Sequence, residues 1–344
     1  MDRKSVFGAV NATALSLVTL LSLPLVAGFF GRVHPAFDSF AHFRVHLAVL
    51  MILCALPLLL GALRREGLVA IAFGLAAITT ATGATFLPGL RPLHAAFAPR
   101  VDNEPVYRLL QMNLRFNNPE PEKFLSLVGR VRPDVITLDE VSDMWSDKIA
   151  LLFPTYPHRI VCTMGNYAGG VAILSLRPFA EGTEGRCIDG GTFATAHLDF
   201  GGRPLEIGAL HMHWPWPFDQ SIQIDAIAGD LANLSENTLL AGDLNAVPWS
   251  TTAARIAEAG ALRQIGPIGV TWLYRRLPEF LRFAGLPIDQ VFAKGGVRIH
   301  SATTLNPAGS DHLPVLVEFS LDAAPGDPVE SDLSITAALA SKHD

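Results

Sequence analysis

The sequence predicts an α+β domain, in which β-sheets pack together with helices outside them, preceded by three transmembrane helices. Before Pro99, three long stretches contain no Asp, Glu, Lys or Arg. After it, short apolar or alternating runs typical of strands recur and outnumber the helical patterns. Half of the 344 residues are apolar and only 17% are charged. Since an average soluble domain is less apolar, part of the chain is expected to meet lipid.

The uncharged stretches cover residues 6–30, 45–63 and 68–90 of a membrane region that we assign to residues 1–90. A bilayer core needs about 20 apolar residues in a helix, because lipid offers no partner to an unpaired backbone group. A cleaved signal peptide and two buried core helices are the alternatives. A signal peptide, however, has a shorter apolar core and is not followed by two more spans. We therefore expect an integral membrane protein.

Basic residues in the short loops indicate the orientation. Pairs of them precede the first stretch and join the second to the third: Arg3, Lys4, Arg64 and Arg65. These should face the cytoplasm, although Arg32 and Arg44 in the opposite loop weaken the signal. An odd number of spans would then place the following domain on the periplasmic or extracellular side of a bacterial inner membrane. An oxidising compartment could join Cys162 to Cys187 there; two buried free thiols are the alternative.

Beyond the membrane region, the Pro- and Ala-rich residues 91–105 are expected to form a linker, residues 106–320 a domain, and residues 321–344 a disordered tail. Within the domain, apolar runs predict strands at 107–113, 135–138, 171–176, 195–199, 205–211, 238–244 and 315–319. Helices are predicted at 119–131 and 221–234, and a third should start at Ser250, whose hydroxyl can cap the following turn.

Polar side chains stand at the ends of these strands or in the motifs beside them. They are Asn113, Glu140, His211, Asp243, Asn245, Asp289, Asp311 and His312. Taken singly, each has an ordinary explanation, such as turn chemistry for Asn or Asp and a satisfied structural role for His. Taken together, polar groups at strand ends can converge on one rim of a sheet core, where loops leave room for a ligand.

The segments around these residues follow a fixed order along the chain. They read QMNLRFNN (111–118), PDVITLDEV (133–141), GGVAILS (169–175), LHMHWPWP (210–217), AGDLNAVPWS (241–250), PIDQVF (287–292) and GSDHLPV (309–315). In this order they resemble the endonuclease/exonuclease/phosphatase superfamily over essentially the whole domain. The likeness is closest to a bacterial branch with N-terminal membrane helices. It implies a four-layered α/β sandwich, in which two packed mixed sheets are flanked by helices.

The resemblance also implies the roles of a metal-dependent phosphoesterase. Glu140, Asn113 and Asp311 would bind Mg²⁺, for which Mn²⁺ could substitute. Asp243 would activate the attacking water and Asn245 would hold the phosphate. His312 would donate to a phosphoryl oxygen with Asp289 on its other ring nitrogen, and His211 would contact the phosphate from the opposite side. Carboxylate and amide oxygens are ligands that Mg²⁺ prefers.

The sequence departs from the family pattern at Asp139, Leu244 and Gln290. None removes an expected catalytic group, although Asp139 could change the charge near the metal. Four aromatic and histidine residues, His213, Trp214, Trp216 and Trp249, could form a platform near the rim or simply pack within loops.

The substrate is expected to be a phosphate ester: nucleic acid, a phospholipid headgroup or a phosphorylated metabolite. Residues 101–320 carry 17 Lys and Arg against 24 Asp and Glu, which disfavours binding to duplex DNA. A catalytically silent binding module of the same fold is the alternative, and so is a membrane protein whose helices do the work. Intact Glu140, Asp243 and His312 argue against the first, and the lack of charges within the spans argues against the second. No protein partner can be inferred.

Overall fold

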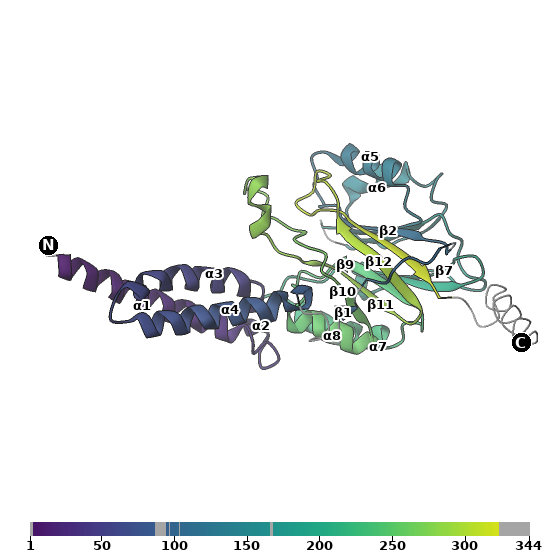
Figure 1. Cartoon of the computed structure of the whole chain (residues 1–344). Helices are drawn as coiled ribbons and strands as arrows, with labels where there is room; N and C mark the ends of the chain where they lie inside the picture. Colours follow the sequence, from purple (N-terminus) through teal and green to yellow (C-terminus); the bar gives the residue numbers. More distant parts are fainter. Residues whose placement is uncertain (1–2, 87–93, 96, 103, 166–167, 323–344) are drawn as a thin grey trace, which may run out of the picture.

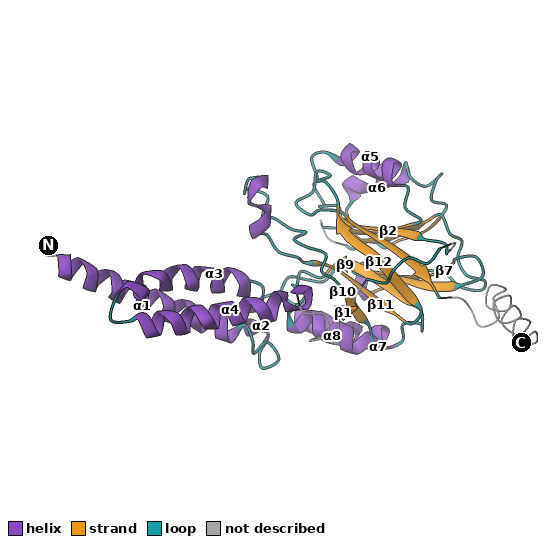
Figure 2. Cartoon of the chain, viewed as in Figure 1, coloured by secondary structure: helices purple, strands orange, loops and turns teal. Residues whose placement is uncertain are grey.

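The computed structural model describes residues 3–86, 94–95, 97–102, 104–165 and 168–322 (Figure 1). A bundle of long N-terminal helices projects from one side of a β-rich body, as the colouring by secondary structure in Figure 2 shows. The tail expected at residues 321–344 lies outside the described residues from 323 onward, since Leu321 still belongs to the last strand.

Three helical stretches make up the bundle: α1 (Arg3–Ala27), α3 (Arg44–Ala55) with the 3-10 helix η1 (Leu56–Leu60), and α4 (Arg64–Phe86). Small side chains such as Ala48 and Ala77 are buried between them, which lets the backbones approach closely. In the described chain, Val6–Ala27 and Arg64–Thr82 are long and apolar enough to cross a membrane. A third span exists only if α2 (Pro35–Ala41) and residues 44–60, bent by 63°, count as one.

Helix α2 occupies the loop between the first two stretches and docks onto the β-rich body. The Asp38 carboxylate accepts hydrogen bonds from the backbone N–H groups of Thr251 (2.7 Å) and Thr252 (3.0 Å), at the start of α8 (Thr251–Gly260). The first amides of a helix have no partner within it and carry partial positive charge. Asp38 therefore caps α8 from another segment, alongside the predicted cap Ser250, which accepts from the Ala253 N–H.

The described strands form two mixed sheets. One has the order β1 (His94–Ala95), β10 (Arg263–Ile265), β11 (Asp289–Lys294), β9 (Thr238–Asp243), β8 (Pro204–Leu210), β7 (Phe193–Asp199) and β6 (Arg186–Ile188). The other has the order β12 (Val297–Thr304), β13 (Val315–Leu321), β2 (Tyr107–Asn113), β3 (Val135–Val141), β5 (Gly170–Ser175) and β4 (His158–Val161). The pairs β1–β10, β8–β9 and β2–β3 are parallel and the remaining neighbours antiparallel.

Helices cover the outer face of each sheet (Figure 1). On one side, α5 (Pro121–Val131) and α6 (Asp143–Ala150) pack Phe124 and Trp145 onto the six-stranded sheet. On the other, α7 (Gln220–Ala232) and α8 pack Ile227 and Ile256 onto the seven-stranded sheet. The prediction of an α+β domain with packed mixed sheets and outer helices is therefore confirmed.

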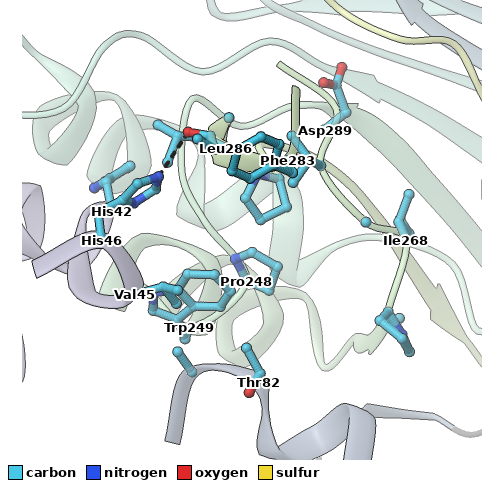
Figure 3. Close-up of a pocket in the computed structure, with 18 of the residues that line it drawn as sticks. His42, Val45, His46, Thr82, Pro248, Trp249, Ile268, Phe283, Leu286 and Asp289 are labelled. Carbon is cyan, nitrogen blue, oxygen red and sulfur yellow. Dashed lines mark hydrogen bonds between the residues drawn. The ribbon is translucent and has the colours of Figure 1, made fainter. Parts of the chain in front are cut away.

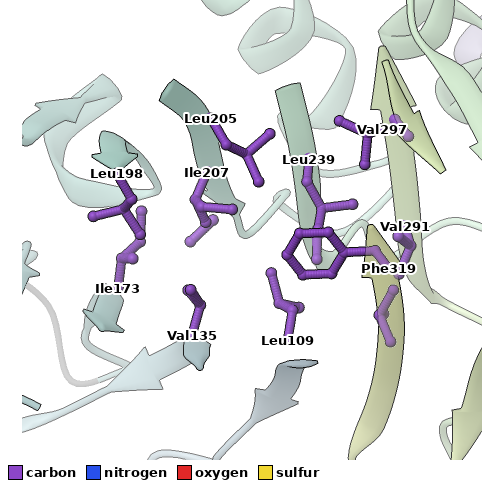
Figure 4. Close-up of a cluster of buried hydrophobic side chains, with 14 of the residues drawn as sticks. Leu109, Val135, Ile173, Leu198, Leu205, Ile207, Leu239, Val291, Val297 and Phe319 are labelled. Atoms are coloured by element: carbon purple, nitrogen blue, oxygen red, sulfur yellow. The ribbon is translucent and has the colours of Figure 1, made fainter. Parts of the chain in front are cut away.

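Between the sheets lies a core of buried side chains (Figure 4). Leu109 and Val135 from one sheet face Ile207 and Leu239 from the other, and Phe319 fills the space beside them. Burial of such side chains contributes roughly 1.5–3 kcal/mol each relative to exposure. This packing fixes how the ends of β2, β3 and β9 lie relative to one another.

The segment expected to be a linker is partly bound to the domain. His94–Ala95 pair as β1 with Gln264–Ile265, and the Ala98 N–H donates to the Ile299 carbonyl at 2.7 Å. Residues 91–93, 96 and 103 of that segment lie outside the described residues. The described part therefore extends the edges of both sheets instead of running free between membrane and domain.

A disulfide joins Cys162, directly after β4, to Cys187 in β6. Because β4 and β6 are edge strands of different sheets, the bond ties the two sheets together at one end of the sandwich. The cysteine pair that the sequence left open is thus bonded.

Thiol labelling tests this bond. Alkylation of the unfolded, non-reduced protein should modify only Cys54, because it is the free cysteine, and reduction should expose two further thiols to mass spectrometry. The double change Cys162→Ala/Cys187→Ala should lower the free energy of unfolding by about 2–4 kcal/mol, since the bond restricts the unfolded chain. Labelling of all three cysteines before reduction would contradict the bond.

Candidate active site

The side-chain amide of Asn113 is hydrogen-bonded to carboxylates at the ends of strands in both sheets. Asn113 is the last residue of β2, Glu140 lies near the end of β3, and Asp243 is the last residue of β9. The Asn113 Nδ2 donates to Glu140 Oε1 and to Asp243 Oδ2, each at 3.0 Å. Asn113 and Asp243 are buried and Glu140 is half-buried. Three of the predicted site residues therefore meet at one rim of the sandwich.

Glu140 reaches this rim through an irregular backbone. The register of β3 against β5 shifts between Leu138 and Val141, and Glu140 has a left-handed φ of 57°. Such a φ is uncommon for a residue other than glycine and is typical of strained functional positions. The bulge turns the carboxylate toward Asn113, and its second oxygen accepts the Phe116 N–H at 2.8 Å.

Asp243 is positioned by the close approach of two strands. A Cβ on the preceding Gly242 would lie 2.0 Å from the Leu210 carbonyl oxygen, so only glycine fits there. Beyond the strand, Asp243 Oδ1 accepts the backbone N–H of Asn245 at 2.8 Å, and Asn245 turns with φ 46°. The Asn245 amide then donates to the Met212 carbonyl at 2.9 Å. The loop thus folds back over the end of β8.

His312 and Asp289 form a buried pair beside Asp243. Nδ1 of His312 lies 2.8 Å from Asp289 Oδ2, and its Nε2 lies 3.6 Å from Asp243 Oδ2. Burial alone would lower the pKa of His312, but the carboxylates of Asp289 and Asp243 outweigh it and raise this pKa to about 10. His312 is therefore an imidazolium at neutral pH, with its free N–H directed toward Asp243.

Ser310 connects this histidine to β2, a role that no sequence pattern indicated. Its hydroxyl donates to the Asn113 carbonyl at 2.9 Å and accepts the His312 N–H at 3.1 Å. The loop that carries His312 is thereby fixed to the residue that joins Glu140 and Asp243.

His211 approaches Asp243 from β8. Its Nε2 lies 3.9 Å from Asp243 Oδ2. Burial lowers the pKa of His211, so that the neutral ring is favoured. Asp243 thus stands between a charged and a neutral histidine.

Asp311 is held in place through its backbone carbonyl. Its backbone carbonyl accepts from the Leu273 N–H and from Arg282 Nη1, both at 3.1 Å. Among the described residues, no hydrogen bond joins its carboxylate to Asn113 or Glu140. Its part in metal binding stays a prediction.

Buried negative charge at this rim fits a divalent cation. Burial, together with Asp289, raises the pKa of Asp243 to about 7 despite the nearby His312. In the described part of the chain, neither Glu140 nor Asp243 has a Lys or Arg partner; the ion pairs of Asp243 are with histidines. Carboxylate oxygens are hard ligands that Mg²⁺ takes, so Glu140 and Asp243 suit such an ion. Asn113 turns its amide nitrogen toward both carboxylates, and its Oδ1 accepts the Arg115 N–H at 2.8 Å, so metal binding by Asn113 stays a prediction.

A second possible cation cluster overlaps this one. Asp243, Asp289 and His312 offer ligand atoms that lie within 4.8 Å of one another. Two of its three members already contact each other, since His312 Nδ1 lies 2.8 Å from Asp289 Oδ2, and the cluster does not include the Glu140 carboxylate. We therefore favour the side of Asp243 that faces Glu140.

The three departures from the family pattern lie in the interior. Asp139 accepts from Gln111 Nε2 at 2.6 Å and from the Asp243 N–H at 2.8 Å, and burial, then Asp243, raises its pKa well above the usual value. The neutral form of Asp139 is thus favoured. Asp139 therefore supports the end of β9 through its hydrogen bond with the Asp243 N–H and adds little charge to the site. Leu244 is in the core under α7 and α8, and Gln290 donates to the Ala246 carbonyl at 3.0 Å.

The four residues that were suggested as a platform, His213, Trp214, Trp216 and Trp249, contact different parts of the protein. Trp249 donates its indole N–H to the Ala41 carbonyl at 2.8 Å, so it packs against α2. Trp214 and Trp216 are about half exposed, and Trp214 meets the edge of Trp272. His213 is exposed, and its backbone is hydrogen-bonded to the side chains of Gln220 and Gln223 in α7. The four residues therefore do not form one platform.

Comparisons with known proteins agree with this arrangement. The profile of the Endonuclease/Exonuclease/phosphatase family matches residues 110–312. Among solved structures, an endonuclease/exonuclease/phosphatase from Beutenbergia cavernae has 18% identity and a TM-score of 0.50, covering 64% of this chain and 73% of that one. The human Nocturnin catalytic domain with bound sulfate has 18% identity and a TM-score of 0.51, covering 64% and 96%.

A third similar structure, D. rerio TDP2 complexed with a single-strand DNA product, has 15% identity and a TM-score of 0.50, covering 62% of this chain and 99% of that one. At such identities these likenesses show the fold alone. No functionally curated protein matches the sequence.

The charge of His312 can be measured directly. Asp289→Asn removes the nearest carboxylate, so it should lower the pKa of His312 by about one to three pH units, followed by NMR of ¹³C-labelled histidine in the full chain. Asp147→Asn, on the exposed face of α6, is the matched control and should leave this titration unchanged. A neutral His312 at pH 7 in the unaltered protein would contradict the assignment.

Proposed function

Because this chain belongs to the endonuclease/exonuclease/phosphatase family, we propose that it is a membrane-anchored, magnesium-dependent phosphoesterase that hydrolyses a phosphodiester or a phosphomonoester. One observation carries the proposal. Asp243 Oδ2 lies 3.0 Å from Asn113 Nδ2, on the Glu140 side, and 3.6 Å from His312 Nε2. A carboxylate that can accept a proton thus stands between the Asn113–Glu140 end of the site, where we propose that the metal binds, and a charged donor.

Each residue has a task in this scheme. A magnesium ion held by Glu140 and Asn113, with Asp311 near them, would supply positive charge to the phosphoryl oxygens. Asp243 takes a proton from the water that attacks phosphorus in line with the departing oxygen. His312, kept charged by Asp289, donates its Nε2–H to a phosphoryl oxygen.

Two further residues act on the phosphate in this proposal. Asn245 holds it beside Asp243, and neutral His211 donates to it from the side opposite His312. The 3.9 Å between His211 Nε2 and Asp243 Oδ2 supports this placement, since both groups face the same space.

Membrane anchoring forms the second part of the proposal. Helices α1 and α4 are long and apolar enough to span, and many of their large side chains are exposed. We propose that residues 1–90 anchor the chain and that the catalytic domain of residues 106–320 lies on the periplasmic or extracellular side. The Cys162–Cys187 bond supports an oxidising compartment. Arg64 and Arg65, at the start of α4, support a cytoplasmic position for the loop between η1 and α4.

The same site disfavours a catalytically silent module. A binding domain has no need of a buried carboxylate between two histidines. Burying charge costs free energy, and buried carboxylates with shifted pKa values cluster at catalytic sites. For the substrate we propose a phosphate ester outside the cytoplasm. The excess of acidic residues in the domain speaks against duplex DNA.

Variants of the site separate its roles. Asp243→Asn keeps size and hydrogen bonding but removes the proton acceptor, so turnover should fall by roughly two to four orders of magnitude. Glu140→Gln removes a metal ligand, so activity should fall and partly recover as magnesium is raised. His312→Ala should lower turnover at every magnesium concentration. Full-length protein would be assayed with MgCl₂ on DNA, RNA, sphingomyelin and phosphate monoesters.

Asp147→Asn on α6 serves as the surface control and should retain native turnover. Near-native rates in all three site variants under limiting magnesium would refute the assigned site, even with a family match. Equal, magnesium-independent losses in Glu140→Gln and Asp243→Asn would instead refute the division of roles between them.

A reporter fusion tests the orientation. Alkaline phosphatase joined after Asp322 should be active in a bacterial host, because that enzyme needs an oxidising compartment. A fluorescent protein joined at the same residue should stay dark there. Inactive phosphatase together with a bright fluorescent fusion would place the domain in the cytoplasm.

A further inference from the structure

A cavity of about 520 Å³ lies where the helical bundle meets the domain (Figure 3). One wall comes from α3 and the end of α4 and includes Val45 and Thr82. The facing wall belongs to the domain and includes Trp249, Ile268 and Phe283. Cavities of roughly 300–1,000 Å³ are the usual size of ligand sites, so this space can hold a molecule larger than a few waters.

The polar groups around the cavity are largely engaged inside the protein. Both ring nitrogens of His42 lie 3.0 Å from backbone carbonyls, and the Trp249 indole N–H and Thr82 hydroxyl donate to carbonyls at 2.8 and 2.9 Å. His46 Nε2 lies 2.8 Å from the Ala284 carbonyl, while its buried Nδ1 has no partner. Because few polar atoms are free to bond a ligand, the cavity suits a hydrocarbon chain.

The cavity is continuous with the apolar surface of the bundle. Val49 and Leu50 of α3 line it and are also exposed. On the domain side, the segment that carries η3 (Glu279–Ala284) projects toward the N-terminal helices in Figure 1. Its Phe280 and Phe283 are 76% and 78% exposed. Exposed apolar groups of this size mark contacts with a membrane or a partner, so a chain can enter the cavity from lipid.

On its other side the cavity borders the candidate active site. Asp289 forms part of the wall, and Figure 3 shows its carboxylate turned away from the centre of the cavity, where it meets His312 Nδ1 at 2.8 Å. His42, also in the wall, contacts the carbonyl oxygen of Asn245. Cavity residues therefore directly contact residues that we assign to phosphate hydrolysis.

We propose that the cavity binds the hydrocarbon chain of a lipid phosphoester, with the phosphate of that lipid at Asp243 and His312. The inference rests on the proposed function and narrows its substrate class to a membrane lipid with a phosphorylated headgroup. The chain remains in contact with the α3 and α4 wall, while the headgroup bends past Asp289 to the catalytic rim. Nucleic acid and soluble phosphate esters have no part that uses this cavity.

Photolabelling tests the chain site without requiring turnover. The probe is hexadecyl phosphate that carries a diazirine midway along its chain, added to full-length Asp243→Asn protein in phosphatidylcholine nanodiscs. Mass spectrometry should locate the label in peptides that contain Val45–Leu50 and Phe283–Pro287. Excess unlabelled hexadecyl phosphate should compete, whereas butyl phosphate should not.

Matched variants distinguish the cavity from general contact with lipid. Val49→Trp places a larger side chain in the cavity wall, so labelling there should fall roughly tenfold, a difference of about 1.4 kcal/mol in binding free energy. Val69→Trp, an exposed position of α4 that does not line the cavity, should have no such effect. Label spread evenly over the bundle, or unchanged by Val49→Trp, would overturn the proposal.

A second comparison links the chain to the phosphate site. His312→Ala should weaken labelling by hexadecyl phosphate but not by the same probe with a hydroxyl in place of the phosphate. Equal labelling by both probes would show a lipid site unconnected to catalysis and would overturn the substrate class. A different result would contradict the proposed phosphoesterase function. In that case the cavity would still be labelled, but the unaltered enzyme would hydrolyse none of the phosphate esters.

Discussion

The two hydrogen bonds that the Asn113 amide donates, to Glu140 and to Asp243, hold together the carboxylates of separate sheets. Two ionised carboxylates that share one amide group repel each other, and burial strengthens the repulsion. The arrangement persists because the apolar core between the sheets fixes the ends of β2, β3 and β9, so that the strand ends cannot move apart without loss of packing. Interior packing thus maintains a concentration of negative charge that suits a divalent cation.

The sequence predicted those strands, helices and site residues that stand in or beside a local run of apolar residues, and it missed those that do not. Strands such as β2 and β9 show short apolar or alternating runs, and the polar residues that end them, Asn113 and Asp243, stood out for that reason. The short strands β6 and β10 and the more polar β12 lack such runs and were missed. Helix α6 was missed because Trp145 and Ile149 alone mark its buried face. The support network around the site, including Ser310 and the Gln111–Asp139 pair, joins residues distant in sequence and had no local signal.

The junction between bundle and domain has no signal in the local sequence. Asp38 caps α8 and His42 touches the loop of Asn245, and both contacts join residues more than 200 positions apart in sequence. Each of these polar groups is buried, and an unpaired buried polar group costs free energy. The N-terminal helices therefore pack against the domain and form part of the wall behind its candidate catalytic loop.

The central claim is that a divalent cation binds at Glu140, on the side that faces Asp243, and anomalous diffraction from crystals soaked in Mn²⁺ tests it most directly. The account predicts one anomalous peak within bonding distance of a Glu140 oxygen, which added Mg²⁺ displaces and which Glu140→Gln removes. A peak bonded to His312 and Asp289, with none at Glu140, would contradict it.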